Sequence, residues 1–370
     1  MTLPPFKLER YFARYEFSAP YLLCSSDCEA RSVAELLALE PDAAARFERC
    51  WLGYTESLGA PTLREEISRL YTTIRPEEVL VFSGAEEAIF WFMHAALQPG
   101  DHVIVHSPGY QSLSELPLSL GCDVTPWLAR EENGWALDLD QLEASLRPTT
   151  RAVILNTPHN PTGYLMSAAD FARLNRLTQA RGVLLFCDEV YRGLEYQEAE
   201  RLPAGCDLNP LAVSLGVLSK TYGLAGLRIG WIATHQRELY QRMLTLKDYT
   251  TICNSAPSEF LAELALRHGP ALAGRNLAII AHNLALLDDF FLRHAARLAW
   301  ARPRAGSVAF PRLLQGEIEA FCHDLVTQQG VMLLPGTVFD GSNHFRLGFG
   351  RKNMPEALNR LDAFLGQAGG

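Results

Sequence analysis

The sequence predicts an α/β fold in which helices cover both faces of a mostly parallel sheet. Two observations lead to this prediction. Short, continuously apolar runs recur along the middle of the chain, and longer amphipathic segments separate them. A strand with one solvated face alternates apolar and polar residues, whereas a strand buried on both faces is apolar throughout, as in parallel sheets covered by helices.

The predicted elements begin with a strand over residues 79–82. The turn Ser83-Gly84 leads from it into a helix over 85–97, which Pro99-Gly100-Asp101 ends. Further apolar runs predict strands over 102–105, 152–155, 183–187, 213–218 and 229–233.

The two ends of the chain differ from this middle part. Residues 1 to about 50 are irregular in pattern and rich in aromatic residues. From about residue 281, helices alternate with short strands such as 307–310 and 344–349.

The length of 370 residues suggests about two domains. We expect a large α/β domain over residues 46–270 and a smaller α+β domain formed by residues 1–45 and 271–370. A long helix within 255–293 is expected to join them.

The composition argues against several classes of protein. Lys and Arg number 33 and Asp and Glu 42, and the resulting net charge of −9 disfavours a nucleic-acid partner. The longest apolar runs, such as residues 211–218, fall short of the roughly 20 residues that a membrane span needs. Residues 1–17 mix charges with aromatics, unlike a signal peptide. We expect a soluble, cytoplasmic protein with no nucleic-acid and no membrane partner.

The eight cysteines are scattered and are expected to be reduced. Cys24 and Cys28 could begin a metal site, but no second pair of Cys or His residues at ligand spacing accompanies them. We therefore predict no bound metal.

Two polar features stand at the ends of predicted strands, where open α/β sheets bind ligands. Gly84, Ala85 and Glu86 open the first helix, and the free N–H groups of such a turn suit a phosphate, although the turn is also a common helix cap. Asn160-Pro161-Thr162-Gly163 follows the strand over 152–155 and could also be an ordinary proline turn.

Two charged features stand at similar positions. Asp188, in Asp188-Glu189-Val190-Tyr191, follows an apolar strand, where a carboxylate is costly unless a cation satisfies it. A surface loop would explain Glu189 better than it explains Asp188. Lys220, in Ser219-Lys220-Thr221, also follows an apolar strand, where desolvation lowers the pKa of a lysine and favours Schiff-base chemistry. A lysine there could equally extend to the surface.

Together the four features fit pyridoxal 5′-phosphate (PLP), which needs a lysine for its aldehyde, an anion for its pyridinium nitrogen and a phosphate cradle. Lys220 would form the Schiff base and then move a proton as a general base. Asp188 would keep the ring nitrogen protonated, and Asn160 and Tyr191 would hydrogen-bond the phenolic oxygen. The other phosphate ligands would be Ser219 and Arg228.

Three of these segments resemble the class I/II aminotransferases of the fold-type I PLP enzymes. They are residues 160–163, 188–191 and 219–230, and they occur in the order and spacing of that family. The resemblance covers nearly the whole chain and implies a seven-stranded, mostly parallel sheet in the large domain.

The resemblance also implies further site residues. Tyr110, in Ser107-Pro108-Gly109-Tyr110, matches the aromatic ring that stacks on the cofactor pyridine. Tyr54 matches the tyrosine that reaches the phosphate of the other subunit, which implies a homodimer with active sites at the subunit interface. Arg346 matches the arginine that binds the substrate α-carboxylate through a two-pronged ion pair, with Asn160 beside it.

The chain departs from the family pattern in three places. Val217 stands where a serine often donates to the phosphate, so that contact is either lost or supplied by another group, such as Ser83. The segment 246–254 lacks the arginine of dicarboxylate-specific members, which argues against a dedicated aspartate aminotransferase. The N-terminal loop over 23–29 carries Asp27, which could meet a basic side chain or cap the helix that starts near Ser32; we favour the cap.

The resemblance implies a PLP-dependent aminotransferase that moves the amino group of an L-α-amino acid to a 2-oxo acid by a ping-pong mechanism. The same motifs also occur in β- and γ-lyases, in capreomycidine-synthase-like cyclases and in amino-acid oxidases, and residue types alone do not separate these outcomes. A ligand-sensing regulator of the same fold would usually carry a basic DNA-binding segment, for which the N-terminal region is too short and the chain too acidic.

Overall fold

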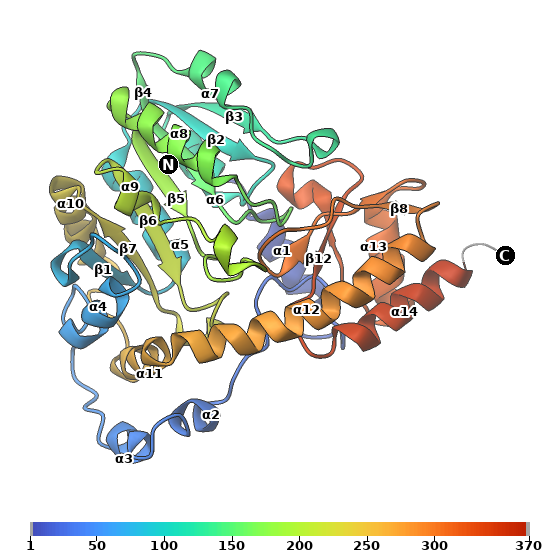
Figure 1. The fold of residues 1–370 in the computed structure, drawn as a ribbon, viewed down its shortest axis with the longest axis horizontal. Helices are drawn as coiled ribbons and strands as arrows, with labels where there is room; N and C mark the ends of the chain where they lie inside the picture. Colours follow the sequence, from blue (N-terminus) through green and yellow to red (C-terminus); the bar gives the residue numbers. More distant parts are fainter. Residues whose placement is uncertain (1–2, 368–370) are drawn as a thin grey trace.

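A seven-stranded sheet forms the centre of the larger part of the molecule in the computed structural model, which describes residues 3–367 (Figure 1). Its strand order is β1-β7-β6-β5-β4-β2-β3. The strands are Val79–Phe82 (β1), His102–Ser107 (β2), Asp123–Leu128 (β3), Thr150–Asn156 (β4), Leu184–Asp188 (β5), Ala212–Val217 (β6) and Gly230–Thr234 (β7). Strand β7 is antiparallel to β1 and β6, and all the other pairs are parallel. The predicted mostly parallel sheet is confirmed.

One strand of this sheet, β3, was not predicted from the sequence. β3 lies at an edge and pairs only with β2. Most of its residues are exposed or half-buried, and Asp123 and Pro126 interrupt its apolar character. A strand that is not buried on both faces gives no continuous apolar run, which was the signal used for the others.

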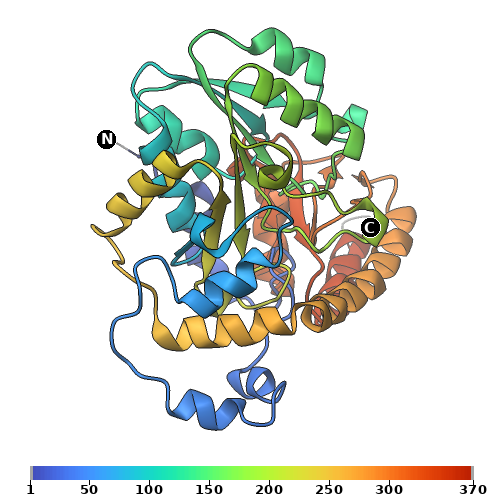
Figure 2. The same ribbon diagram turned by 60° about the vertical axis from the view of Figure 1, so that its left-hand side comes forward.

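Alternate residues of β4 show that helices cover both faces of the sheet (Figure 2). Ala152 and Ile154 belong to the core that contains α5 (Ala85–Ala96), whereas Val153 and Leu155 belong to the core that contains α8 (Ala168–Ala180). The other helices of this part are α4 (Pro61–Ser68), α6 (Ser112–Ser119), α7 (Leu139–Ser145), α9 (Gly205–Leu208), α10 (Arg237–Lys247) and α11 (Ala256–Arg267). Short 3₁₀ turns lie at Pro76–Glu78, Glu131–Asn133, Glu198–Glu200, Ala225–Leu227 and Gly336–Phe339.

The N-terminal region contains three helices, of which only the one starting near Ser32 was expected, so the prediction that the rest of this region is irregular is wrong. They are α1 (Lys7–Tyr15), α2 (Val33–Leu37) and α3 (Ala43–Glu48). Helices this short give little periodicity over the windows from which a helix is normally read. The helix expected near Ser32 is α2, and Ser32 and Glu35 form a capping box at its start.

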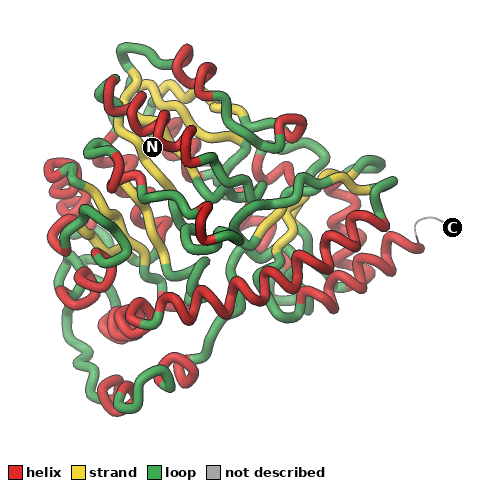
Figure 3. The backbone as a smooth tube through the Cα atoms, in the orientation of Figure 1, coloured by secondary structure: helices red, strands yellow, loops and turns green. Residues whose placement is uncertain are grey.

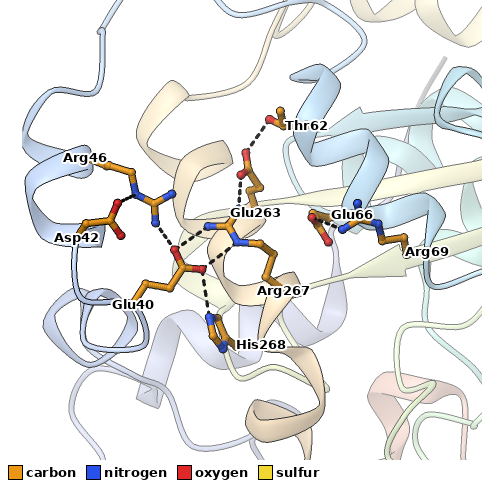
Figure 4. A network of polar contacts seen from close by, with 9 residues as sticks. All are labelled: Glu40, Asp42, Arg46, Thr62, Glu66, Arg69, Glu263, Arg267 and His268. Atoms are coloured by element: carbon orange, nitrogen blue, oxygen red, sulfur yellow. Dashed lines mark hydrogen bonds and ion pairs between the residues drawn. The ribbon is translucent and has the colours of Figure 1, made fainter.

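Helices α2 and α3 form an arm that projects from the rest of the chain (Figures 1 and 3). Glu40, between the two helices, attaches this arm to the end of α11 (Figure 4). Arg267 donates from Nε and Nη2 to Glu40 at 2.9 and 3.2 Å, His268 Nε2 lies 3.2 Å from the same carboxylate, and Arg46 also pairs with it.

The C-terminal part is built on two small sheets. β12 (Phe345–Gly348) lies between β11 (Leu334–Pro335) and β9 (Val308–Ala309), and β10 (Arg312–Leu313) pairs with β8 (Leu298–Ala299). Helices α13 (Ile318–Gln329) and α14 (Met354–Gln367) pack beside them.

A 25-residue helix, α12 (Gly269–Arg293), runs from the end of α11 to the C-terminal part and lies within the interval where a joining helix was expected (Figure 1). The domain limits after residues 45 and 270 stay a prediction. Among the described helices, none combines the length and apolar character needed to cross a membrane.

Candidate active site

A cavity of about 310 Å³ lies where the ends of β4, β5 and β6 meet the N-terminal segment and β12. The predicted site residues that line it are Ala85, Glu86, Tyr110, Asn160, Asp188, Tyr191, Ser219, Lys220, Arg228 and Arg346. These residues come from segments far apart in the sequence, so the fold brings them to one place.

Lys220 follows β6 and is partly buried in this cavity. Its Nζ donates to Ser26 Oγ at 2.8 Å and lies 5.8 Å from the centre of the Tyr191 ring. Burial lowers the pKa of Lys220 to about 8, although the nearby Asp27 carboxylate opposes the shift. The amine is therefore closer to its neutral, nucleophilic form than an exposed lysine would be.

Asp188 is the last residue of β5, and only 5% of its surface is exposed. Burial raises its pKa to about 7, and the Val190 N–H, 3.3 Å from Oδ1, the charge of Lys220 and the Asn156 amide lower it only in part. A buried carboxylate this poorly compensated gains when a cation binds beside it.

Tyr191 is 1% exposed, and its hydroxyl makes no hydrogen bond of normal length in the described part of the chain, although the Ser26 hydroxyl is close enough to oppose the rise of its pKa. Burial raises its pKa. Buried hydroxyls are nearly always hydrogen-bonded, so a partnerless one on a cavity wall indicates a ligand atom within reach.

The start of α5 and Arg228 also belong to the lining of the cavity. Gly84 has a φ of 91°, and a Cβ on it would lie 2.5 Å from the Arg228 guanidinium, so only glycine allows this approach. Arg228 itself has a left-handed backbone with a φ of 54° at the end of the 3₁₀ turn Ala225–Leu227. The helix start and the guanidinium thus converge on one region, which suits an anion.

Arg346 lies in β12 and is 2% exposed. Its Nε donates to the Cys24 carbonyl at 3.0 Å, and its Nη1 donates to Asn160 Oδ1 at 3.2 Å. The described residues place no carboxylate at ion-pair distance from it. A buried guanidinium without a counter-anion is stabilised when the carboxylate of a ligand binds to it.

Several residues of this cavity were not predicted from the sequence. Asn156 holds two of the predicted motifs together, since its Nδ2 donates to the Asp188 carbonyl and its Oδ1 accepts from the Asn160 N–H at 2.7 Å. A polar residue at the end of an otherwise apolar strand was the available signal. The other missed lining residues include Leu8, Glu9, Phe12, Glu16, Ser26 and Arg351.

The favoured role of Asp27 as a helix cap is wrong. Ser32 caps α2, whereas Asp27 lines the cavity and accepts two hydrogen bonds from Arg351 Nη2, at 3.0 and 2.9 Å. Because Ser32 already caps α2, the Asp27 carboxylate is available for its ion pair with Arg351, which lies 324 positions away in the sequence.

Tyr54, Val217 and Ser83 differ in their position relative to the cavity. Tyr54 is outside the cavity and 82% exposed, next to the exposed Trp51 and Leu52. Val217 lines the cavity where a serine was expected from the family pattern, and Ser83 is not part of the lining. Within residues 3–367, no group of three or more His, Cys, Asp or Glu side chains is arranged to bind a metal ion.

Comparison with known proteins places this geometry in a family. A sequence model described as aminotransferase class I and II matches residues 21–361. The chain belongs to the class I and II aminotransferase family. The capreomycidine synthase of Streptomyces vinaceus is 32% identical over 373 residues, which cover 99% of this chain and 95% of that protein.

Solved structures of the family agree with this assignment. A PLP-dependent aminotransferase from Streptococcus suis superposes with a TM-score of 0.93 at 33% identity over 99% of both chains. The PLP-dependent cyclase OrfR superposes with a TM-score of 0.92 at 33% identity, covering 100% of this chain and 98% of its own. The fold is that of the fold-type I PLP enzymes, and the protein is a PLP-dependent member of the aminotransferase family.

The residues present fit PLP. The partnerless Tyr191 hydroxyl and the poorly compensated Asp188 offer one hydrogen-bonding group and one carboxylate to a polar aromatic ring. The start of α5 and Arg228 offer a place for its phosphate. Lys220, with its lowered pKa, stands in the same cavity.

Proposed function

We propose that the protein transfers the amino group of an L-α-amino acid to a 2-oxo acid by a ping-pong mechanism, in the cavity around Lys220. The observation that supports this proposal best is that Lys220, Asp188 and Arg346 line a single cavity of about 310 Å³. Bound PLP supplies the electron withdrawal that acidifies the substrate Cα–H bond. The cytoplasm is the expected location.

Lys220 is proposed to take the proton from the substrate Cα and to return it during the reverse half-reaction. A general base works best when its pKa lies near the working pH, and burial brings that of Lys220 to about 8. Ser26 holds the amine through the 2.8 Å hydrogen bond, so the side chain already has a defined direction.

Asp188 is proposed to pair with the protonated ring nitrogen of the cofactor, and Tyr191 and the Asn160 amide to bond its phenolic oxygen. Asn160 can serve two neighbours at once, because its Oδ1 accepts from Arg346 and its Nδ2 remains available. Gly84, Ala85 and the Glu86 N–H at the start of α5 are proposed to hold the phosphate. Ser219 and Arg228 would complete that set.

Arg346 is proposed to bind the substrate α-carboxylate. The Cys24 carbonyl and Asn160 fix the plane of its guanidinium, which leaves the other N–H groups for a two-pronged contact. Tyr110, which packs against Phe6 with ring centroids 5.2 Å apart, is proposed to stack on the cofactor ring.

We further propose a homodimer in which Tyr54 reaches the phosphate in the other subunit. Trp51, Leu52 and Tyr54 are 76%, 79% and 82% exposed in the single chain, an unusual exposure for three neighbouring large side chains. Light scattering gives the mass, and Tyr54→Phe should weaken PLP binding without changing that mass.

The test of the reaction is a visible spectrum of the holoenzyme, recorded anaerobically while single amino acids are added without an acceptor. Transamination predicts loss of the lysine-bound cofactor absorbance, accumulation of the pyridoxamine form and release of one oxo acid per site. Lys220→Ala is the control, which should show no lysine-bound absorbance at all. Ammonia release with recovery of the starting spectrum would contradict transamination.

A second candidate is ring closure, in which a side-chain nitrogen forms a bond to the substrate β-carbon after a leaving group on that carbon, such as a hydroxyl that departs as water, has been eliminated. Similarity to a capreomycidine synthase and to the cyclase OrfR favours it. A cyclase would regain the starting spectrum after every turnover and would release no oxo acid, so the same titration separates the two candidates.

A further inference from the structure

Helix α1 brings two carboxylates to the cavity. Leu8, Glu9, Phe12 and Glu16, at the end of the helix, all line it, and this spacing places them on one helical face. Glu9 is exposed at the rim and Glu16 is half-buried.

The helix is held firmly in this position. The Lys7 N–H donates to Gln111 Oε1 at 2.8 Å, and Gln111 Nε2 donates back to the Pro5 carbonyl at 3.2 Å. Lys7 also forms an ion pair with Asp340, and Phe6 packs against Tyr110. The carboxylates therefore belong to a fixed wall of the cavity.

The other charges of the cavity already have partners, either present or proposed. Arg351 is bonded to Asp27. In the proposed function, Arg346 binds the substrate carboxylate, Arg228 the phosphate, and Asp188 the ring nitrogen. Glu86 accepts a hydrogen bond from Ser112.

Glu9 and Glu16 remain without a partner. Neither side chain has a hydrogen bond or an ion pair with any described residue. Burial, together with the negative charge of Glu9, raises the pKa of Glu16. Arg351 acts on Glu16 only from beyond ion-pair distance, since its guanidinium is occupied by Asp27. A cation placed between the two carboxylates would relieve this repulsion.

A second observation points to an amino-acid ligand in this cavity. The Arg346 guanidinium, on a side chain that is 2% exposed, lines the same cavity and has no carboxylate at ion-pair distance among the described residues. Leu8 and Phe12 add an apolar surface beside the carboxylates, which suits the methylene chain of a long basic side chain.

We infer that the amino-acid substrate carries a cationic side chain, which Glu9 and Glu16 of the α1 segment bind. This inference rests on the proposed function, because it assumes that Arg346 holds the α-carboxylate of the substrate and that the α-amino group lies near Lys220. An ammonium or a guanidinium group at the end of a three- or four-carbon chain is the class of side chain that fits.

The experiment measures the affinity of the anaerobic holoenzyme for two matched pairs of amino acids by visible absorbance. L-arginine is compared with its neutral analogue L-citrulline, and L-lysine with L-norleucine. The cationic member of each pair should bind roughly tenfold tighter, as expected for a charge-assisted hydrogen bond at a partly exposed site. Raising the salt concentration should reduce this preference.

Glu9→Gln and Glu16→Gln should each reduce the cationic preference roughly threefold, and the double variant should abolish it. Glu132→Gln is the matched control, since it removes the same charge from an exposed position outside the cavity and should leave the preference unchanged. Affinity for the neutral amino acids should change little in any variant.

Two failures are distinguishable. If no amino acid alters the absorbance, the proposed function is wrong and this inference is overturned with it. If neutral or acidic amino acids react as well as arginine and lysine, or if both glutamine variants retain the cationic preference, only the inference about the side chain is overturned.

Discussion

Replacing Arg346 by lysine tests the proposed carboxylate contact most directly. The guanidinium is 2% exposed, and two of its N–H groups are taken by the Cys24 carbonyl at 3.0 Å and Asn160 Oδ1 at 3.2 Å. A lysine ammonium has no fork and cannot keep these two bonds while making a two-pronged contact with a substrate.

The expected loss follows from counting bonds. At least one of two charge-assisted hydrogen bonds to the substrate carboxylate disappears, and each contributes about 1.5–3 kcal/mol. Because about 1.4 kcal/mol corresponds to a tenfold change, kcat/KM should fall roughly 10- to 150-fold. The Cys24 carbonyl also loses a donor, so we expect a modest loss of stability alongside.

The assay is the single-turnover half-reaction of Arg346→Lys with an L-α-amino acid, combined with a titration of PLP into the apoprotein. The cofactor affinity should change less than threefold or so, since the proposed role of Arg346 concerns the substrate. Arg351→Lys is the matched control, because Arg351 lines the same cavity but is already paired with Asp27. Equal loss of activity in both lysine variants would refute the reasoning. So would a second result, in which Arg346→Lys weakens the binding of the amino acid and the binding of the corresponding amine, which lacks the carboxylate, to the same extent.

Three other predictions concern the cofactor site and the arm. Burial lowers the pKa of Lys220 to about 8. The rate of the half-reaction should therefore increase as the pH rises through about 8 and then become constant. A rate that does not change between about pH 6 and 9 would contradict the proposed role of this amine. Tyr191→Phe removes a buried hydroxyl without a partner, so denaturant titration of the apoprotein should show that the free energy of unfolding falls by no more than about 0.5 kcal/mol. The variant should nevertheless bind PLP more weakly. Equal destabilisation of the apoprotein and the holoprotein would argue against a contact between the Tyr191 hydroxyl and the cofactor. Hydrogen bonds from Arg267 lower the pKa of Glu40 from 4.5 to about 2, so its carboxylate stabilises the folded chain above about pH 4.5, and this contribution is lost as the pH falls toward about 2. Glu40→Gln should therefore lower Tm by roughly 2–5 °C at pH 7 but much less near pH 2.5, and an equal decrease at both pH values would exclude this explanation.

The sequence predicted those parts of the molecule in which the local pattern and the final environment coincide. β4, β5 and β6 are buried on both faces, so their apolar runs were sufficient to predict them as strands. Lys220 and Asp188 were recognisable as site residues because a charged side chain directly after such a run is costly to bury unless an opposite charge or a ligand compensates it. β3 was missed because an edge strand shares its exposed positions with ordinary loops.

The missed parts of the site depend on contacts between distant segments. Ser26 bonds Lys220 across 194 positions, and Asp27 pairs with Arg351 across 324. Nothing in the loop around Asp27 distinguishes a helix cap from a partner on the far end of the chain. The shared face of α1 that carries Glu9 and Glu16 was readable from their seven-residue spacing, about two helical turns, but only the fold shows that this face lines the cavity.

The position of these two carboxylates also bears on the choice between transamination and ring closure. Both reactions would use the same proton transfer at Lys220 and the same carboxylate contact at Arg346, so those residues cannot separate them. Ring closure requires the terminal nitrogen of the side chain to approach the reacting carbons, whereas a cation bound at Glu9 and Glu16 is held at the α1 wall of the cavity. If that wall keeps the side chain extended, removing both charges weakens binding and leaves the oxo-acid product unchanged. If the wall instead aims the nitrogen at the substrate carbons, the double glutamine variant should release oxo acid in place of a cyclic product. The ratio of the two products in that variant therefore reports which reaction the α1 wall serves.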